Sequence, residues 1–160
     1  MTEEEKIKQE LEEKFGCLKD AVIIKRNRRI FADVPIEKFD EVFAHTVKQM
    51  HFDALSAITG MDRGDSFKVI YHLNREGRVV LNLGINVSKN NPAIKTVTSF
   101  FPGADIYERE IRDLLGMQVE GLPAGGRYPL PDNWPTNEHP LRKDWKAKNS
   151  QKEVRNALLQ

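Results

Sequence analysis

The 160-residue sequence contains a single cysteine, Cys17, which is too few for a disulfide, a CxxC redox pair or a cluster of thiolate ligands. The four histidines do not replace the missing ligands, because no pair of them has the spacing of a recognised metal motif. We therefore expect a protein that holds no metal ion or redox cofactor and works in a reducing, cytoplasmic setting. Cys17 itself is expected to be a small buried hydrophobe.

The sequence also lacks any apolar run near the roughly 18 residues that a membrane-spanning helix needs. Its opening residues, MTEEEKIKQELEEKFG, are acidic and amphipathic, whereas a signal peptide has a basic start and an apolar run. A net charge of +1 gives no overall field that would attract nucleic acid or an anionic membrane. We expect contact with a membrane only through partner subunits.

Proline is sparse before residue 121 and concentrated after it. Residues 121–145 hold five of the eight prolines and both tryptophans. This composition disfavours helix and sheet, yet Trp134 and Trp145 carry large rings that an extended segment cannot bury against itself. We expect residues 117–145 to form an extended subunit-docking arm over the protein's own domain, over a partner or across both, and residues 146–160 to form a polar tail.

Residues 1–116 have the length and periodicity of one α+β domain with a single core. Apolar residues four apart predict a helix over 3–15, and Pro35 favours the first turn of a second helix. Alternating apolar residues over 66–74 and 78–88 predict an antiparallel hairpin with one buried face.

Shorter strands are expected at 20–24, 29–34 and 53–60, and residues 90–103 fit either a short helix or an irregular crossover. The fold class that we expect is α+β, with an antiparallel or mixed sheet covered by helices and followed by the extended Pro-rich C-terminal arm.

A charged helix is predicted over residues 105–116, with Asp105 as a cap and Gly116 as its end. Its apolar residues share an arc of about 100° that should face the sheet: Tyr107, Ile111, Leu114 and Leu115. Arg109, Arg112 and Asp113 are then expected on the opposite side. Four-residue spacings predict ion pairs Asp105–Arg109, Arg109–Asp113 and Glu108–Arg112, each worth about 0.2–0.5 kcal/mol. These charges fit either a solvated helix or pairing with a neighbouring subunit.

The histidines and the basic run are not expected to form a catalytic, metal or nucleic-acid site. His45, His51, His72 and His139 are expected at the surface or an interface, with His72 on the polar side of a strand. The basic run made by Lys25, Arg26, Arg28 and Arg29 favours an exposed hairpin turn over an RNA or anionic-lipid contact, because no interleaved aromatic residues accompany it.

The run FFPGADIYEREIRDLLGM, residues 100–117, resembles the signature of the 30-kilodalton subunit, also called the C subunit, of respiratory NADH:quinone oxidoreductase. The signature residues are Glu108, Arg109, Glu110, Asp113 and Gly116. The family usually continues into Gly-His-Pro, whereas this sequence has Gly-Leu-Pro and then an insert containing RYPLPDNWP. In this respect the sequence is more similar to the corresponding subunit of membrane-bound energy-converting [NiFe] hydrogenases and of their formate hydrogenlyase and sulfur-reducing relatives.

The resemblance implies a cofactor-free, non-catalytic subunit in the peripheral arm of a complex-I-like oxidoreductase, on the cytoplasmic face of the membrane. Its neighbours would be a large hydrogenase-like (49 kDa-type) subunit and a small iron–sulfur subunit, which would carry the [NiFe] site or the iron–sulfur clusters. The complex would be a hydrogenase type that couples electron transfer to ion translocation or, alternatively, a respiratory NADH:quinone oxidoreductase. The expected subunit interface joins the helix to the arm and comprises Glu108, Arg109, Glu110, Arg112, Asp113, Gly116, Arg127, Trp134, Arg142, Lys143, Asp144 and Trp145.

Two other functions remain open at the level of sequence. A free-standing enzyme would use the charged helix as one wall of an active site and would contain a carboxylate that titrates near neutral pH. A nucleic-acid adaptor would use the basic run at residues 25–29, and its binding would weaken as salt rises.

Overall fold

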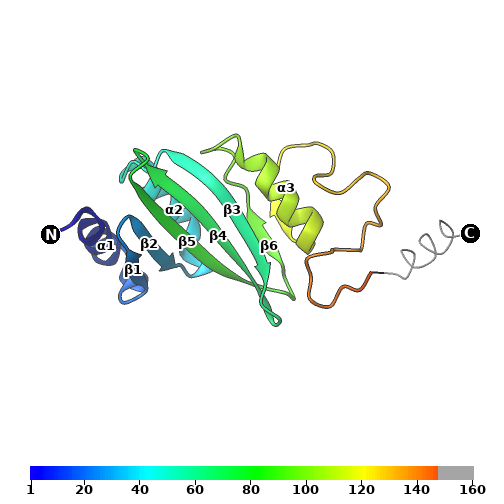
Figure 1. Cartoon of the computed structure of the whole chain (residues 1–160), viewed down its shortest axis with the longest axis horizontal. Coiled ribbons are helices and arrows are strands. Elements are labelled where there is room, and N and C mark those ends of the chain that lie inside the picture. Colours follow the sequence, from blue (N-terminus) through cyan, green and yellow to red (C-terminus); the bar gives the residue numbers. More distant parts are fainter. Residues whose placement is uncertain (148–160) are drawn as a thin grey trace, which may run out of the picture.

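A five-stranded sheet forms the centre of the molecule (Figure 1). The computed structural model describes residues 1–147, so most of the predicted tail 146–160 lies outside the described residues. The strand order is β1-β2-β5-β4-β3, and every neighbouring pair is antiparallel except the parallel pair β2–β5. The bounds are β1 Val22–Arg26, β2 Arg29–Asp33, β3 Ala54–Asp62, β4 Ser66–Arg75 and β5 Val79–Ser88. The predicted α+β class with a mixed sheet is confirmed.

The predicted hairpin is the longest pairing in the sheet. β4 and β5 pair in register from Ser66 opposite Ser88 to Arg75 opposite Val79. Their apolar residues face the core and are almost fully buried, as in Phe67, Tyr71 and Leu83. Alternation in the sequence predicted this pair because a strand turns successive side chains to opposite faces.

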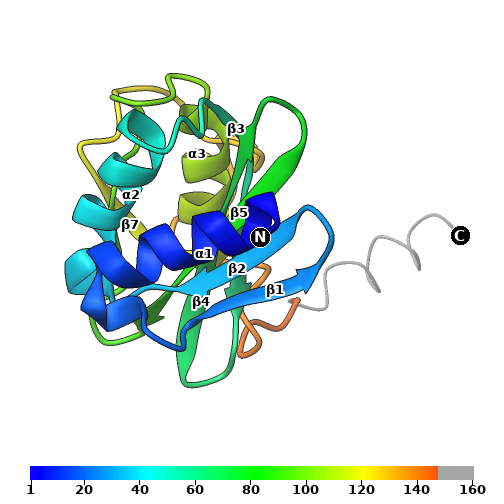
Figure 2. The ribbon, with the colours of Figure 1, turned by 90° about the vertical axis from the view of Figure 1, so that its left-hand side faces the viewer.

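Helices cover one face of the sheet and leave the other face open (Figure 2). They are α1 Glu3–Lys14, α2 Phe39–Lys48 and α3 Ala104–Leu115, with short 3-10 turns at Gly16–Leu18 and Ile36–Lys38. Thr2 and Glu5 form a capping box at the start of α1. The prediction for Cys17 is wrong, because its side chain is exposed on the first 3-10 turn.

The segment that the sequence left open contains a short strand, β6 Ala93–Lys95, followed by turns. It pairs in parallel with β7 Gln118–Glu120, which follows α3. The first residues of the predicted arm 117–145 therefore include a strand, and from Gly121 to residue 147 the backbone forms turns and bends without a helix or strand. No helix within residues 1–147 is both long enough and apolar enough to cross a membrane.

On the open face, one ion pair crosses the middle of the sheet. Lys68 of β4 lies over Gly84 of β5 and reaches Asp33 of β2, with 2.6 Å between Nζ and Oδ1. A Cβ at position 84 would lie 2.8 Å from both Asp33 Oδ1 and Lys68 Cε, so glycine is needed there for space.

Candidate functional site

Helix α3 is fixed to the sheet by its apolar side. Ile111 and Leu115 are buried against Gly60 of β3, and the Tyr107 hydroxyl donates a 3.0 Å hydrogen bond to the carbonyl of Ser56. This is the face that the sequence predicted. The predicted cap is wrong, because Gly103 is the N-cap and Asp105 lies within the first turn of the helix.

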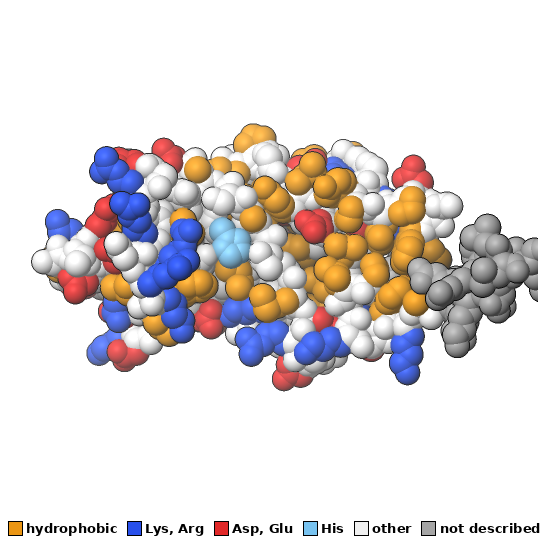
Figure 3. Space-filling model, viewed as in Figure 1, with side chains coloured by type: hydrophobic (Ala, Val, Ile, Leu, Met, Phe, Trp, Pro, Cys, Tyr) orange, Lys and Arg blue, Asp and Glu red, His pale blue; other side chains and the backbone are white. Residues whose placement is uncertain are grey.

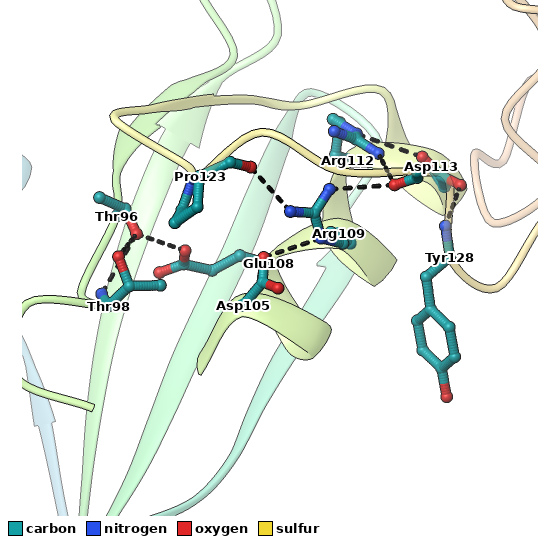
Figure 4. Close-up of polar contacts among 10 residues, drawn as sticks. Thr96, Thr98, Asp105, Glu108, Arg109, Arg112, Asp113, Pro123 and Tyr128 are labelled. Atoms are coloured by element: carbon teal, nitrogen blue, oxygen red, sulfur yellow. Dashed lines mark hydrogen bonds and ion pairs between the residues drawn. The ribbon is translucent and has the colours of Figure 1, made fainter. Parts of the chain in front are cut away.

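Glu108 points into the protein, toward the segment that connects β6 to α3 (Figure 4). It is fully buried and accepts hydrogen bonds from the backbone N–H of Val97 (2.7 Å) and the hydroxyl of Thr96 (2.6 Å). Burial raises the pKa of this carboxyl group, whereas its two hydrogen bonds act in the opposite direction. Glu108 therefore holds the β6–α3 connection to the helix, and it forms no ion pair with Arg112.

Arg109 is also buried, with 7% of its surface exposed. Its guanidinium pairs with Asp105 at 2.7 Å and donates to the carbonyls of Pro123 (2.7 Å) and Gly126 (3.0 Å) at the start of the arm (Figure 4). The predicted pair Asp105–Arg109 is confirmed. Arg109 lies on the side of the helix opposite the apolar face, as predicted, but this side is covered by the arm and not by solvent.

Asp113 organises the next part of the arm. Its carboxylate accepts a 2.9 Å hydrogen bond from the backbone N–H of Tyr128 and lies 3.7 Å from Arg127 Nε. Arg112 Nε lies 3.3 Å from the same carboxylate. Asp113 also lies on the side of α3 opposite the apolar face, as predicted, and only 3% of it is exposed because the arm covers it. A buried carboxylate needs several donors, and the arm supplies two of them.

The end of α3 holds the last part of the arm. His139 Nδ1 donates to the carbonyl of Asp113 (2.8 Å), and Arg142 Nε donates to the carbonyl of Leu115 (2.6 Å). Gly116 ends the helix in the left-handed region with φ +70°, as the sequence predicted, and a Cβ there would lie 2.5 Å from His139. These groups satisfy carbonyls that a helix end leaves without partners.

A second anchor lies on the sheet. The buried carboxylate of Asp62 accepts hydrogen bonds from the backbone N–H groups of Lys143 (2.9 Å) and Gly64 (2.7 Å) and from Lys89 Nζ (2.8 Å). Burial alone would raise the pKa of Asp62, but these donors together lower it to about 2. The arm is thus tied to both α3 and β3.

The two tryptophans contact each other. Their ring centroids lie 6.2 Å apart, Trp134 Nε1 donates to the carbonyl of Glu138, and Trp145 Nε1 lies 3.4 Å from a carboxylate oxygen of the same residue. The two rings contact each other within the arm, an arrangement that the sequence did not predict. Both rings remain partly exposed.

A groove runs between β3 and α3, with a volume of about 250 Å³. Ile58 and Gly60 of β3 line one side, Tyr107 and Glu110 of α3 line the other, and Leu141 of the arm lies at its end. Leu141 is 54% exposed. Hydrophobic side chains gather on this part of the surface, over β3, α3 and the arm (Figure 3). We call this feature the β3–α3 groove.

Comparison with known proteins identifies the family. The family model described as respiratory-chain NADH dehydrogenase, 30 kDa subunit, matches residues 32–151. The protein belongs to this family. Within the part that the structure describes, the match extends from β2 through the sheet and α3 to the arm.

Relatives of this member of the 30 kDa subunit family are parts of multi-subunit oxidoreductases. The C subunit of NADH-quinone oxidoreductase from Chloroherpeton thalassium is 32% identical over 86% of this protein and 58% of its own length. The C subunit of F(420)H(2) dehydrogenase from Methanosarcina mazei is 33% identical over 74% of this protein and 77% of its own length. The NADH-quinone oxidoreductase C subunit of a Roseiflexus strain is 34% identical, and the matched part is 56% of its length. The protein thus spans a little over half the length of the first curated relatives that it matches.

Solved structures share the fold. One component of the membrane-bound sulfane sulfur reductase, described as an archaeal respiratory membrane complex, superimposes with a TM-score of 0.83 over 97% of this protein and 92% of that component, at 24% identity. The trypsin-resistant fragment of Nqo5 superimposes with a TM-score of 0.62 over 76% of this protein and 98% of the fragment, at 28% identity.

The family signature therefore has a structural explanation within one polypeptide. Of the residues expected at a subunit interface, Glu108, Arg109 and Asp113 are buried among the protein's own groups. The other predicted residues reach the surface. Partly exposed are Glu110, Arg112, Gly116, Arg127, Trp134, Arg142 and Trp145, and exposed are Lys143 and Asp144.

Sequence reasoning missed Leu141 and Asp62, because neither lies in a pattern that indicates a contact across the fold. Within residues 1–147, no three His, Cys, Asp or Glu side chains are grouped so that they could hold a metal ion.

Proposed function

We propose that this protein is a cofactor-free, non-catalytic subunit of a membrane-bound, complex-I-like oxidoreductase, which it helps to assemble. Membership of the 30 kDa subunit family supports this function, as do relatives that are the C subunits of NADH-quinone oxidoreductase and of F(420)H(2) dehydrogenase. The partners would be a large 49 kDa-type subunit and a small iron–sulfur subunit, which would carry the [NiFe] site or the clusters. The protein would lie on the cytoplasmic face and reach the membrane only through them.

For the type of complex we favour the energy-converting hydrogenase branch, which includes sulfur-reducing complexes. Support comes from the RYPLPDNWP insert, whose residues 127–135 belong to the arm that α3 holds. The second candidate is the C subunit of a respiratory NADH:quinone oxidoreductase. It is supported by relatives that are named C subunits of NADH-quinone oxidoreductase.

The β3–α3 groove is the observation that carries the docking part of this proposal. An apolar groove with an exposed leucine at its end and a carboxylate, Glu110, on its wall has the composition of a protein contact, with an apolar centre and a polar rim. The arm supplies exposed groups beside it, Lys143 and Asp144, that a neighbouring subunit can pair with. Glu108, Arg109 and Asp113 would act indirectly, because they fix the helix and the arm that form this surface.

Replacement of Leu141 by aspartate tests the docking surface. We expect Leu141→Asp to weaken association with the large subunit at least about tenfold, because an unpaired carboxylate in an apolar contact costs on the order of 1.4 kcal/mol or more. The measurement is the amount of large subunit recovered with the tagged protein from membranes that contain the complex.

The matched control is Ile36→Asp, which places the same charge at an apolar side chain that is 43% exposed and does not line the groove. It should leave recovery unchanged. Equal recovery with the wild type and with Leu141→Asp would remove the β3–α3 groove from the proposal.

A further inference from the structure

The open face of the sheet carries a second hollow, at the opposite end from the arm. It has a volume of about 400 Å³ and lies between the β1–β2 hairpin and β4. Lys25, Arg26 and Arg29 line it from the hairpin, and Phe31 and His72 line it from the sheet. Lys and Arg side chains gather on this part of the surface, over β1 and β2 (Figure 3). We call it the hairpin groove.

The floor of the hairpin groove is held by a chain of hydrogen bonds. Asn82 Nδ2 donates to the carbonyl of Ile30 at 2.8 Å, which leaves Asn82 Oδ1 to face His72 Nδ1 at 2.6 Å. His72 Nδ1 must therefore carry a proton and donate. His72 Nε2 lies 2.9 Å from the Thr59 hydroxyl. The polar side chains of β4 and β5 are thus fixed before any ligand arrives, which lowers the entropy lost on binding.

The cations of the hairpin groove are not neutralised by the described part of the protein. Within residues 1–147, no carboxylate forms an ion pair with Lys25, Arg26 or Arg29. Two acidic groups that lie on the hairpin or contact it have other partners, since Asp33 pairs with Lys68 and Glu4 accepts from the backbone N–H of Arg28. None of the described side chains that line the groove is acidic. The hairpin groove is therefore a local positive site in a protein whose net charge is only +1.

We propose that the hairpin groove binds an acidic, extended polypeptide segment of a neighbouring subunit. Guanidinium groups of Arg26 and Arg29 suit carboxylates because their planar donors can bind both oxygens. Half-buried Phe31 and Val80 offer apolar contact for the side chains between the acidic ones. A segment in which acidic and apolar residues alternate matches both features.

The same observations disfavour two other anionic ligands. A single-stranded nucleic acid needs successive aromatic rings on which bases stack, and Phe31 is the one phenyl ring among the described residues that line the groove. A bilayer surface is flat on this scale, whereas these cations line one side of a hollow.

Binding of a defined peptide to the isolated full-length protein tests this proposal without any partner subunit. The probe is a fluorescein-labelled peptide in which glutamate and valine alternate, and the comparison peptide has glutamine in place of glutamate. Fluorescence anisotropy should show binding of the glutamate peptide alone, and binding should weaken as salt rises. The double variant Arg26→Glu, Arg29→Glu should weaken it about tenfold or more, through lost pairs and added repulsion.

The control is Lys146→Glu, which reverses one exposed charge that does not line the hairpin groove and should leave the affinity unchanged. Thermal unfolding of each variant should match the wild type, since Arg26 and Arg29 have no ion-pair partner within residues 1–147.

Equal affinity for the two peptides, or for the double variant and the wild type, would overturn the proposal. So would tighter binding of labelled oligothymidine or of phosphatidylglycerol vesicles than of the peptide. Failure here leaves the oxidoreductase proposal intact, because that proposal concerns the β3–α3 groove.

Discussion

Glu108, Arg109 and Asp113 are charged residues on one helix, and each has its partners inside the same polypeptide. Glu108 binds the segment before α3, and Arg109 and Asp113 bind the arm after it. Buried charges are tolerated only when their donors and acceptors are supplied, and removal of one partner is costly. The signature of the family therefore describes how a helix is joined to its two flanking segments.

Gly116 should tolerate no side chain. Gly116→Ala places a Cβ at φ +70° and 2.5 Å from His139, so we expect destabilisation of about 1–3 kcal/mol, measured by chemical denaturation. The matched control is Gly126→Ala, because no described atom lies within 4 Å of a Cβ at that position. The control should stay within about 0.5 kcal/mol of the wild type. Equal stability of both variants would show that the contact with His139 does not constrain the turn.

Glu108 should make stability depend on pH. The pKa of Glu108 in the folded state is raised above the ordinary value of 4.5. Between pH 4.5 and this raised pKa, the folded state therefore holds more protons than the unfolded state. The stabilisation that Glu108 gives to the folded state is therefore fully present below pH 4.5. It is lost as the pH rises through the raised pKa of the folded state.

Glu108→Gln retains an acceptor for Val97 and removes the ionisation. We expect the free energy of unfolding of the wild type to fall relative to this variant as pH rises from about 4 to about 8, measured by urea denaturation. Glu110→Gln, at a partly exposed position of the same helix, is the control. Its free energy of unfolding should change with pH in the same way as that of the wild type. Parallel curves for Glu108→Gln as well would contradict the role given to burial.

At the scale of elements, α3 is the junction between the sheet and the arm. One side packs on β3 through Ile111 and Leu115, and the other side binds residues 123–128 through Arg109 and Asp113. The arm passes the C-terminal end of α3 and returns to the sheet at Asp62. The β3–α3 groove exists because these three elements are held together.

Hydrogen exchange should report this attachment. Asp113→Ala removes the acceptor of the Tyr128 N–H, so exchange of that amide should speed up about tenfold or more, since a hydrogen bond to a charged group contributes about 1.5–3 kcal/mol. The amide of Tyr71, in the centre of β4, should be unchanged. Glu110→Ala is the control and should leave Tyr128 protected. Unchanged exchange at Tyr128 in Asp113→Ala would mean that Asp113 does not hold the arm.

The helices, the central hairpin and the C-terminal end of α3 could be predicted from the sequence because each depends on local spacing. Alternation predicted β4 and β5, and the capping box predicted the start of α1. Helical spacing correctly placed Arg109 and Asp113 opposite the apolar face, but it could not show that the arm covers this polar side. The contacts from Asp62 to Lys143 and from Trp134 to Trp145 depend on where the arm turns, which no periodicity records.

At the scale of the whole molecule, the two candidate contact surfaces differ in chemistry and come close to each other at β3, where Ser56 lines the hairpin groove and Ala57 lines the β3–α3 groove. The β3–α3 groove is apolar and extends toward the arm, and the hairpin groove is basic and extends toward β1 and β2, where Lys and Arg side chains gather (Figure 3). A protein that binds one neighbour through each surface would link them without any chemistry of its own. This arrangement fits a subunit that assembles a larger oxidoreductase.

The most direct measurement is the identity of the proteins that co-purify with the tagged full-length protein from membranes of its native host. We expect mass spectrometry to find oxidoreductase subunits in stable amounts, including a large 49 kDa-type subunit and a small iron–sulfur subunit. Two CxxC pairs in the large subunit would favour the hydrogenase branch, and their absence would favour the respiratory alternative. Recovery of the protein as a monomer, with no oxidoreductase subunit attached, would contradict the proposed function as an assembly subunit.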